Sequence, residues 1–138
     1  MGVLALVSCR VELATIDMSQ YSAAVEVNAE GAELDTTNFA SGGWEALIMG
    51  LKKFTLKVKF NDDYAVSTVD DRAWGWFNTG TNVAFKIRPT SAAISTTNPS
   101  IEGLFVPSAY TFVGGSVGDL ATKDLTWPGS GSLSRVTA

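Results

Sequence analysis

Residues Phe54–Phe60 read FTLKVKF, and apolar and polar side chains alternate at every position of this stretch. Because successive side chains of a β-strand point to opposite faces, a period of two predicts a strand. The apolar positions then face a core, while Thr55, Lys57 and Lys59 face solvent or pair with acidic side chains.

Strand patterns continue on both sides of this stretch. In residues 22–28, Ala23, Val25 and Val27 share one face. Six more segments have strand character: residues 11–16, 83–88, 101–105, 110–113, 124–127 and 133–137. Proline cannot donate to a strand ladder, so Pro107 and the turn at residues 128–131 are expected to interrupt the later strands.

One helix is expected, from Tyr64 to Asn78. Apolar side chains recur there at helical spacing and make a single stripe, formed by Val66, Val69, Ala73, Trp76 and Phe77. Asp62 or Ser67 is suited to the N-cap, and Gly80 to the C-terminal end.

About eight strands and one helix (about residues 64–78) predict a mainly β fold, a β-sandwich or barrel with the helix against it. The 138 residues contain no internal repeat and no linker. Residues 1–138 are therefore expected to form a single domain around one core.

The chain lacks the residues that several kinds of catalysis and metal binding require. The chain has no histidine, which removes Ser-His-Asp and Cys-His arrangements and the commonest metal ligand. Its one cysteine, Cys9, cannot form an intrachain disulfide. Gly114–Gly118 matches the G-x-S-x-G pattern, but that chemistry needs a base to take the serine proton. The acidic pairs at residues 62–63 and 70–71 fit helix capping and a solvated face better than a calcium site. No catalytic residue, metal site or cofactor is expected, and the chain is predicted not to be an enzyme.

The charge composition indicates which kinds of partner the chain could bind. Charged residues make up 17% of the chain, against an average of about 25%. Either partner subunits cover part of the surface, or the chain is a soluble β-domain rich in small polar residues. The net charge of −4 does not favour binding to phosphate backbones. No apolar run approaches the ~20 residues that span a bilayer, so no membrane association is expected.

The stretch from Leu34 to Leu51 lies between two predicted strands and contains no catalytic pattern. Phe39, Trp44, Leu47 and Ile48 are too apolar for a free loop, and such patches usually mark interaction sites. We interpret this stretch as a contact surface for another copy of the same chain.

The order of motifs resembles one family. LDTTNF at residues 34–39 is followed by GLK at 50–52, NDDY at 61–64, IRP at 87–89 and GSVGDLA at 115–121. Over about residues 10–137, this order and spacing resemble the major tail (tail tube) proteins of long-tailed bacteriophages.

The resemblance implies a β-sandwich or barrel with a flanking helix, assembled into hexameric rings that stack into a hollow tube. It also implies that DNA passes through without specific binding, and that tape measure and terminator proteins are partners. Assembly would occur in the bacterial host cytoplasm, and the final location would be the virion tail. The family has no catalytic residues. The regions implied are residues 38–50 for the contact between rings, and residues 22–28 and 54–60 for the lumen wall.

A passage for DNA should be neutral to acidic, because a basic wall would hold the phosphates. We therefore expect acids to outnumber cations in the bore. Glu26 is the first candidate to face it, with Glu12 and Glu33 as weaker ones. Lys57 and Lys59 must then pair with these glutamates across strands or lie outside the bore.

Two other classes of protein stay open. A carbohydrate- or receptor-binding β-sandwich would use Trp44 and Trp127, in Gly/Ser-rich loops, to stack on sugar rings. The other class is a capsid decoration protein. Tubes of uniform width, monomers that bind glycans, or capsid-bound trimers would distinguish the three.

Overall fold

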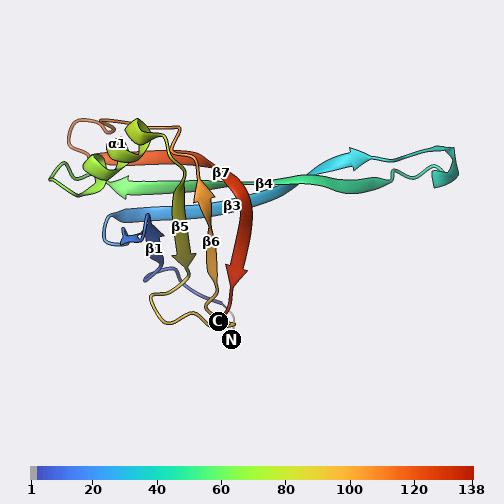
Figure 1. Ribbon diagram of the computed structural model, residues 1–138, viewed down its shortest axis with the longest axis horizontal. Helices are drawn as coiled ribbons and strands as arrows, with labels where there is room; N and C mark the ends of the chain where they lie inside the picture. Colours follow the sequence, from blue (N-terminus) through green and yellow to red (C-terminus); the bar gives the residue numbers. More distant parts are fainter. Residues whose placement is uncertain (1–2) are drawn as a thin grey trace.

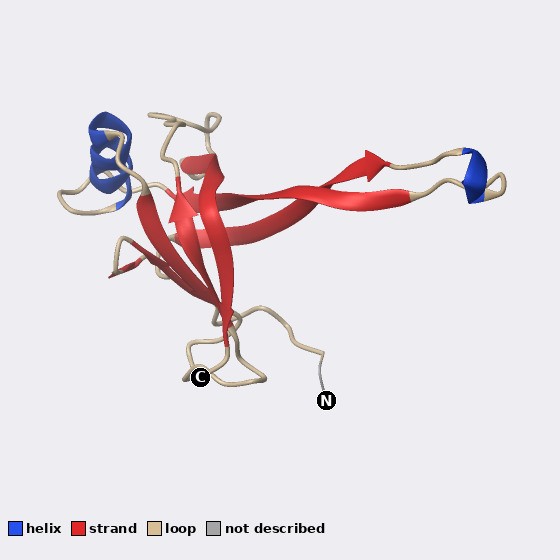
Figure 2. Cartoon of the chain, turned by 45° about the vertical axis from the view of Figure 1, so that its right-hand side comes forward, coloured by secondary structure: helices blue, strands red, loops and turns tan. Residues whose placement is uncertain are grey.

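The computed structural model describes residues 3–138; residues 1 and 2 lie outside the described part. The elements in chain order are β1 (Arg10–Leu13), β2 (Ile16–Asp17), β3 (Ser22–Asp35), the 3-10 turn η1 (Phe39–Ser41), β4 (Leu47–Asn61), α1 (Val69–Thr79), β5 (Val83–Arg88), β6 (Ser100–Phe105) and β7 (Thr122–Val136). The fold is mainly β with one flanking helix, which confirms the predicted fold class (Figures 1 and 2).

All strand pairs are antiparallel, in the order β2-β1-β5-β6-β7-β4-β3. Strand β7 joins the two halves, because its first part pairs with β4 and its second part with β6. Phe54 on β4 and Phe85 on β5 lie with their ring centroids 5.9 Å apart. The two halves therefore pack face to face around one core, and Figure 1 shows β5 and β6 crossing β3 and β4.

The bend of β7 corrects one prediction. Residues 124–127 and 133–137 are not two strands around a turn, but parts of one strand that changes partner. Thr55 of β4 is paired with Pro128, and the next residue, Gly129, is already paired with Phe105 of β6. A Cβ at Gly129 would lie 2.2 Å from the Phe54 ring, so only glycine lets the strand pass so close to it.

Strands β3 and β4 are longer than predicted. Residues 22–28 and 54–60 are only their inner parts, because the pairing continues from Ser22 with Phe60 out to Asp35 with Leu47. Leu47 and Ile48 therefore lie in β4 and not in a loop. The outer parts are exposed on both faces, so no period-two pattern in the sequence marks them as strands.

Two shorter strand predictions also change. Residues 11–16 are split between β1 and β2, because Ala14 and Thr15 have φ angles of 54° and 64° and form a tight turn. Residues 110–113 form no strand, since residues 106–121 run as an irregular segment. The predicted strands at 83–88 and 101–105 are confirmed as β5 and β6.

Helix α1 begins five residues later than predicted. Its N-cap is Thr68, not Asp62 or Ser67, and the side chain of Thr68 makes no capping bond. Residues 62–68 instead form turns, in which the Asp63 carboxylate accepts from the Ala65 N–H at 2.9 Å. Gly80 ends the helix in the left-handed conformation, as predicted.

The helix covers one end of the core. Its Val69 and Ala73 are buried, whereas Val66, which was predicted for the apolar stripe, precedes the helix and is exposed. Trp76 packs edge-on against Phe105 and Trp127, with ring centroids 5.9 and 6.2 Å away. Trp127 is only 1% exposed, so it belongs to the core and cannot stack on a sugar.

Candidate assembly interface

A long hairpin projects from the body of the fold (Figures 1 and 2). It consists of the outer parts of β3 and β4, beyond the point where β4 pairs with β7 at Thr55. We call residues 30–53 the arm. Its tip is residues 36–46, and its root is the body-side end at Lys52 and Lys53.

The tip is an ordered turn. The side chain of Asn38 accepts from the Ala40 N–H at 2.9 Å, and the Ser41 hydroxyl accepts from the Asn38 N–H at 3.1 Å. These two bonds form a capping box at η1. The Thr36 N–H donates to the Ala46 carbonyl at 2.8 Å and closes the loop. Because the polar groups of the tip bond to one another, its aromatic side chains are left free to face outward.

The arm carries large apolar side chains in solvent. Phe39 is fully exposed and Trp44 is 81% exposed, although aromatic side chains of this size are usually buried. Every other large apolar residue of the arm is also exposed: Leu34, Leu47, Ile48, Met49 and Leu51. Exposed apolar patches of this kind often mark interaction sites, so the arm is a candidate interface. Leu34, Met49 and Leu51 lie within the stretch interpreted as a contact surface but were not among its named contact residues, although the apolar run Leu47-Ile48-Met49 could have indicated Met49.

The structure groups some of the predicted lumen residues. On the outer face of β3, β4 and β7, Lys57 lies directly opposite Glu26, and Lys59 lies opposite Asp124. Lys53 forms an ion pair with Glu30, with 3.2 Å between nitrogen and oxygen. Val25 and Val27 pack against the core on the other face. The lysines of this face therefore alternate with acids across the strands.

Glu12 and Glu33 lie elsewhere. Glu12 is on β1, in the other half of the sheet order, opposite Lys86 and 3.6 Å from the Arg10 guanidinium. It does not share a face or a neighbouring strand with Glu26, contrary to the grouping expected from the sequence. Glu33 lies on the arm, opposite Met49, beyond a register shift in β3.

A buried lysine was missed by the sequence prediction. Lys123 on β7 is fully buried, and its Nζ lies 3.2 Å from carboxylate oxygens of both Asp62 and Asp70. It also donates to the carbonyls of Thr111 and Phe112. Asp62 and Asp70 are thus partners of a buried cation, and Asp62 is not on a solvated face as expected. The cluster fastens the irregular segment 106–121 to the start of α1.

Two tyrosines complete this cluster. The Tyr64 hydroxyl donates to Asp62 at 2.8 Å, and the Tyr110 hydroxyl donates to Asp70 at 2.6 Å. The bond to Asp62 is the main cause that raises the pKa of Tyr64 to about 12. The pKa of Tyr110 is also raised above its ordinary value. The main cause is burial, and the hydrogen bond to Asp70 is the second cause. Both hydroxyls therefore stay protonated at neutral pH and act as donors.

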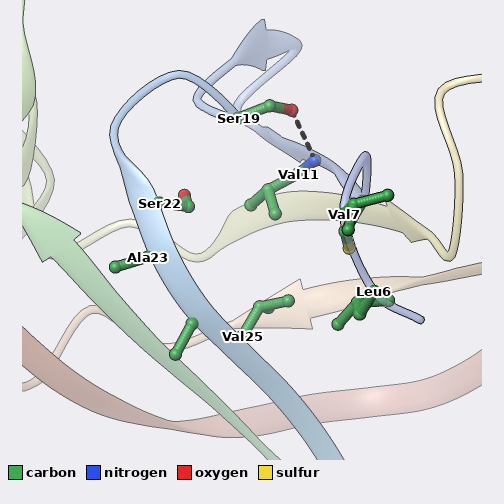
Figure 3. A pocket seen from close by; sticks show the side chains of 9 residues that line it. Leu6, Val7, Val11, Ser19, Ser22, Ala23 and Val25 are labelled. Atoms are coloured by element: carbon green, nitrogen blue, oxygen red, sulfur yellow. Dashed lines mark hydrogen bonds between the residues drawn. The ribbon is translucent and has the colours of Figure 1, made fainter.

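Figure 3 shows a hollow near the N-terminal segment, lined by Leu6, Val7 and Val25 among others. The Ser19 hydroxyl beside it already accepts from the Val11 N–H at 2.8 Å. Burial raises the pKa of the nearby Cys9 thiol, which disfavours the reactive thiolate. Nothing in this arrangement points to a nucleophile.

Within residues 3–138, no group of three or more His, Cys, Asp or Glu side chains is placed to hold a metal ion. Among the same residues, no helix has the length and apolar character needed to cross a membrane. Among the features described, the exposed apolar arm is the candidate functional surface.

Comparison with known proteins adds two structures. No protein-family model matches this chain, and no curated protein matches it. A solved structure described as "Virion of native gene transfer agent (GTA) particle" aligns at a TM-score of 0.74 with 19% identity, covering 94% of this chain and 95% of that one. Another structure is described as "Tail of empty GTA particle computed with helical refinement, C6 symmetry". It aligns at a TM-score of 0.67 with 21% identity, covering 89% of this chain and 87% of that one. The chain therefore has the fold of a component of these particles over nearly its whole length.

Proposed function

We propose that this chain is the tube-forming structural protein of a phage-like tail and has no catalytic role. One observation carries the proposal: an exposed apolar arm projects from a fold that is shared with a tail of C6 symmetry. The resemblance of the sequence to tail tube proteins supports the same function. In this proposal residues 1–138 act as one unit in hexameric rings, and the rings stack into a tube in the virion tail.

Strand edges support ring formation. β3 is the last strand in the order, so one edge of its 14 residues has no strand partner within the described chain. Unpaired edges promote aggregation unless they are covered. Pairing between neighbouring subunits would satisfy this edge in every copy of a closed ring.

The arm supports stacking. Phe39 and Trp44 are exposed on the ordered tip, and the tip lies at the end of the hairpin that is far from the body (Figure 1). We propose that the arm docks on the adjacent ring, with Trp44 as the anchor and with Leu47 and Ile48 beside it.

The face that carries Glu26, Lys57 and Lys59 is our candidate for the lumen wall. Acids lie opposite its lysines across the strands and would offset their charge, so that DNA could pass without being held. Tape measure and terminator proteins would be the other partners, met during assembly in the host cytoplasm.

The test is microscopy of the purified protein at high concentration, together with light scattering. Tubes of uniform width with six-fold end views are the expected result. Monomers that bind glycans would favour a carbohydrate- or receptor-binding module instead, and trimers that attach to capsids would favour a decoration protein. A chain that stays monomeric both in solution and in virions overturns the proposal.

A further inference from the structure

The arm has a charge polarity along its length. In the arm, Glu33, Asp35 and Glu45 lie in the outer part and the tip, which contain no lysine or arginine. The arm's cations, Lys52 and Lys53, lie at the root, where Glu30 is the acid opposite Lys53. The outer arm and tip are therefore acidic, while the root is basic.

The acidic side chains of the outer arm and the tip are free for a partner. Glu33, Asp35 and Glu45 are all exposed, and none forms an ion pair within residues 3–138. Bonds from the Thr37 side chain and backbone lower the pKa of Asp35, so this carboxylate is ionised at neutral pH. The tip thus presents the Glu45 carboxylate next to Trp44, and the adjoining end of β3 adds Glu33 and Asp35.

The root has a groove of complementary character. β7 leaves β4 after Pro128 to join β6, so the edge of β4 from Leu47 to Phe54 has no second strand beside it in the described chain. A hollow of about 510 Å³ opens there, with Phe54 and Leu133 among its walls and with Lys52 and Lys53 in its lining. A second hollow of about 440 Å³ shares both lysines and adds Leu51 and the acid Glu30, so its lining has two cations and one anion.

The positive charges of the two lysines in this groove are only weakly offset by acidic side chains of the same chain. Lys53 pairs with Glu30, but both side chains are mostly exposed, and such pairs are weak. Lys52 forms no ion pair within residues 3–138. The groove therefore offers apolar walls and an uncompensated positive charge.

We infer that the acidic, aromatic tip of one copy binds the basic, apolar root groove of the next copy, head to tail. This inference rests on the proposed function and names the surface that receives the arm. Two acidic tips repel each other, as do two basic roots, so contacts of tip with tip or of root with root are disfavoured. A head-to-tail contact that does not close on itself grows in one direction, as a tube requires.

Charge reversal tests this pairing. Glu45→Lys and Lys52→Glu each place like charges at the tip-to-root contact, and each should lower the fraction of protein that sediments as tubes by at least tenfold. Mixing the two variants should restore tubes, because the basic tip of one then meets the acidic root of the other. Asp119→Lys makes the same change of charge in an exposed loop outside the arm and serves as the control.

The outcomes separate the inference from the proposed function. If wild-type protein forms no tubes and is monomeric in virions, the proposed function fails. If wild-type tubes form but both reversed variants assemble normally, or if their mixture stays unassembled while both remain folded by circular dichroism, the tip-to-root contact is wrong and the tube function stands. Assembly of the wild type should also weaken as salt rises from 50 to 500 mM, because salt screens the exposed charges.

Discussion

The Nζ atom of Lys123 lies 3.2 Å from a carboxylate oxygen of Asp62, and neither side chain is exposed to solvent. Asp70 provides a second carboxylate at the same distance. This cluster joins three parts of the chain that are distant in sequence: the end of β4, the start of α1 and the irregular segment 106–121.

Lys123→Met should be strongly destabilising, because it leaves Asp62 as a buried charge without its cation. Breaking a buried pair in this way costs ~3–5 kcal/mol. Urea unfolding followed by tryptophan fluorescence measures the loss. The exposed Lys52→Met is the control and should change stability by less than about 0.5 kcal/mol, as surface substitutions usually do. Equal stability of the two variants would show that the cluster is not structural.

Alkaline pH should weaken this cluster. The pKa of Tyr64 is raised to about 12 from an ordinary value of 10, mainly by its bond to Asp62. Its contribution to stability is therefore complete below pH 10 and is lost as the pH rises through about 12. The comparison is with Tyr64→Phe, because this variant lacks only the hydroxyl that donates to Asp62. The difference in unfolding free energy between wild type and Tyr64→Phe should shrink over this interval. A constant difference from pH 8 to 12 would contradict the linkage.

Gly129→Ala should strain the bend of β7. The added methyl would lie 2.2 Å from the buried Phe54 ring, and overpacking of this kind costs ~1–3 kcal/mol. Adding Phe54→Leu should make the glycine substitution less costly, because the smaller side chain yields space. A double-mutant cycle by urea unfolding measures the coupling. Additive effects of the two substitutions would show that Phe54 does not require glycine there.

Trp44→Ala should leave folding intact and stop tube growth. The indole is exposed in the single chain, and a buried interface tryptophan is typically worth ~2 kcal/mol or more of binding. Electron microscopy and sedimentation measure assembly, and thermal unfolding measures stability. Val117→Ala shortens a fully exposed apolar side chain outside the arm and is the control. Normal tubes from Trp44→Ala would reject the arm as the stacking contact.

The lumen assignment predicts a gain of DNA binding. Glu26→Lys puts a second cation opposite Lys57, so tubes of this variant should retain duplex DNA in a salt-dependent way while wild-type tubes do not. Co-sedimentation at low and high salt measures retention, and Asp119→Lys again controls for net charge. A map of the tube that shows the bore lined by unpaired Lys57 and Lys59 would overturn this account of the channel.

Local periodicity predicted the inner parts of the fold well. The alternation in residues 54–60 and 83–88 corresponds to strands whose inward side chains are buried, and Gly80 ends the helix as expected. In these segments one face meets a core and the other meets water, so burial imposes the period on the sequence. The apolar character of Phe39 and Trp44 also predicts a contact surface, and both side chains are exposed on the arm.

Other features depend on contacts between distant residues, which no local pattern contains. The sequence by itself determined a mainly β chain with one helix, without the residues for histidine-based catalysis, and with apolar residues between two strands. Only the tertiary structure decided that these residues form an arm, because the arm is exposed on both faces and shows no alternation. The tertiary structure also decided that β7 runs unbroken past Pro128, since its pairing moves from β4 to β6 there. The burial of Lys123 depends on Asp62, Asp70 and the carbonyls of segment 106–121, which only the folded chain brings together.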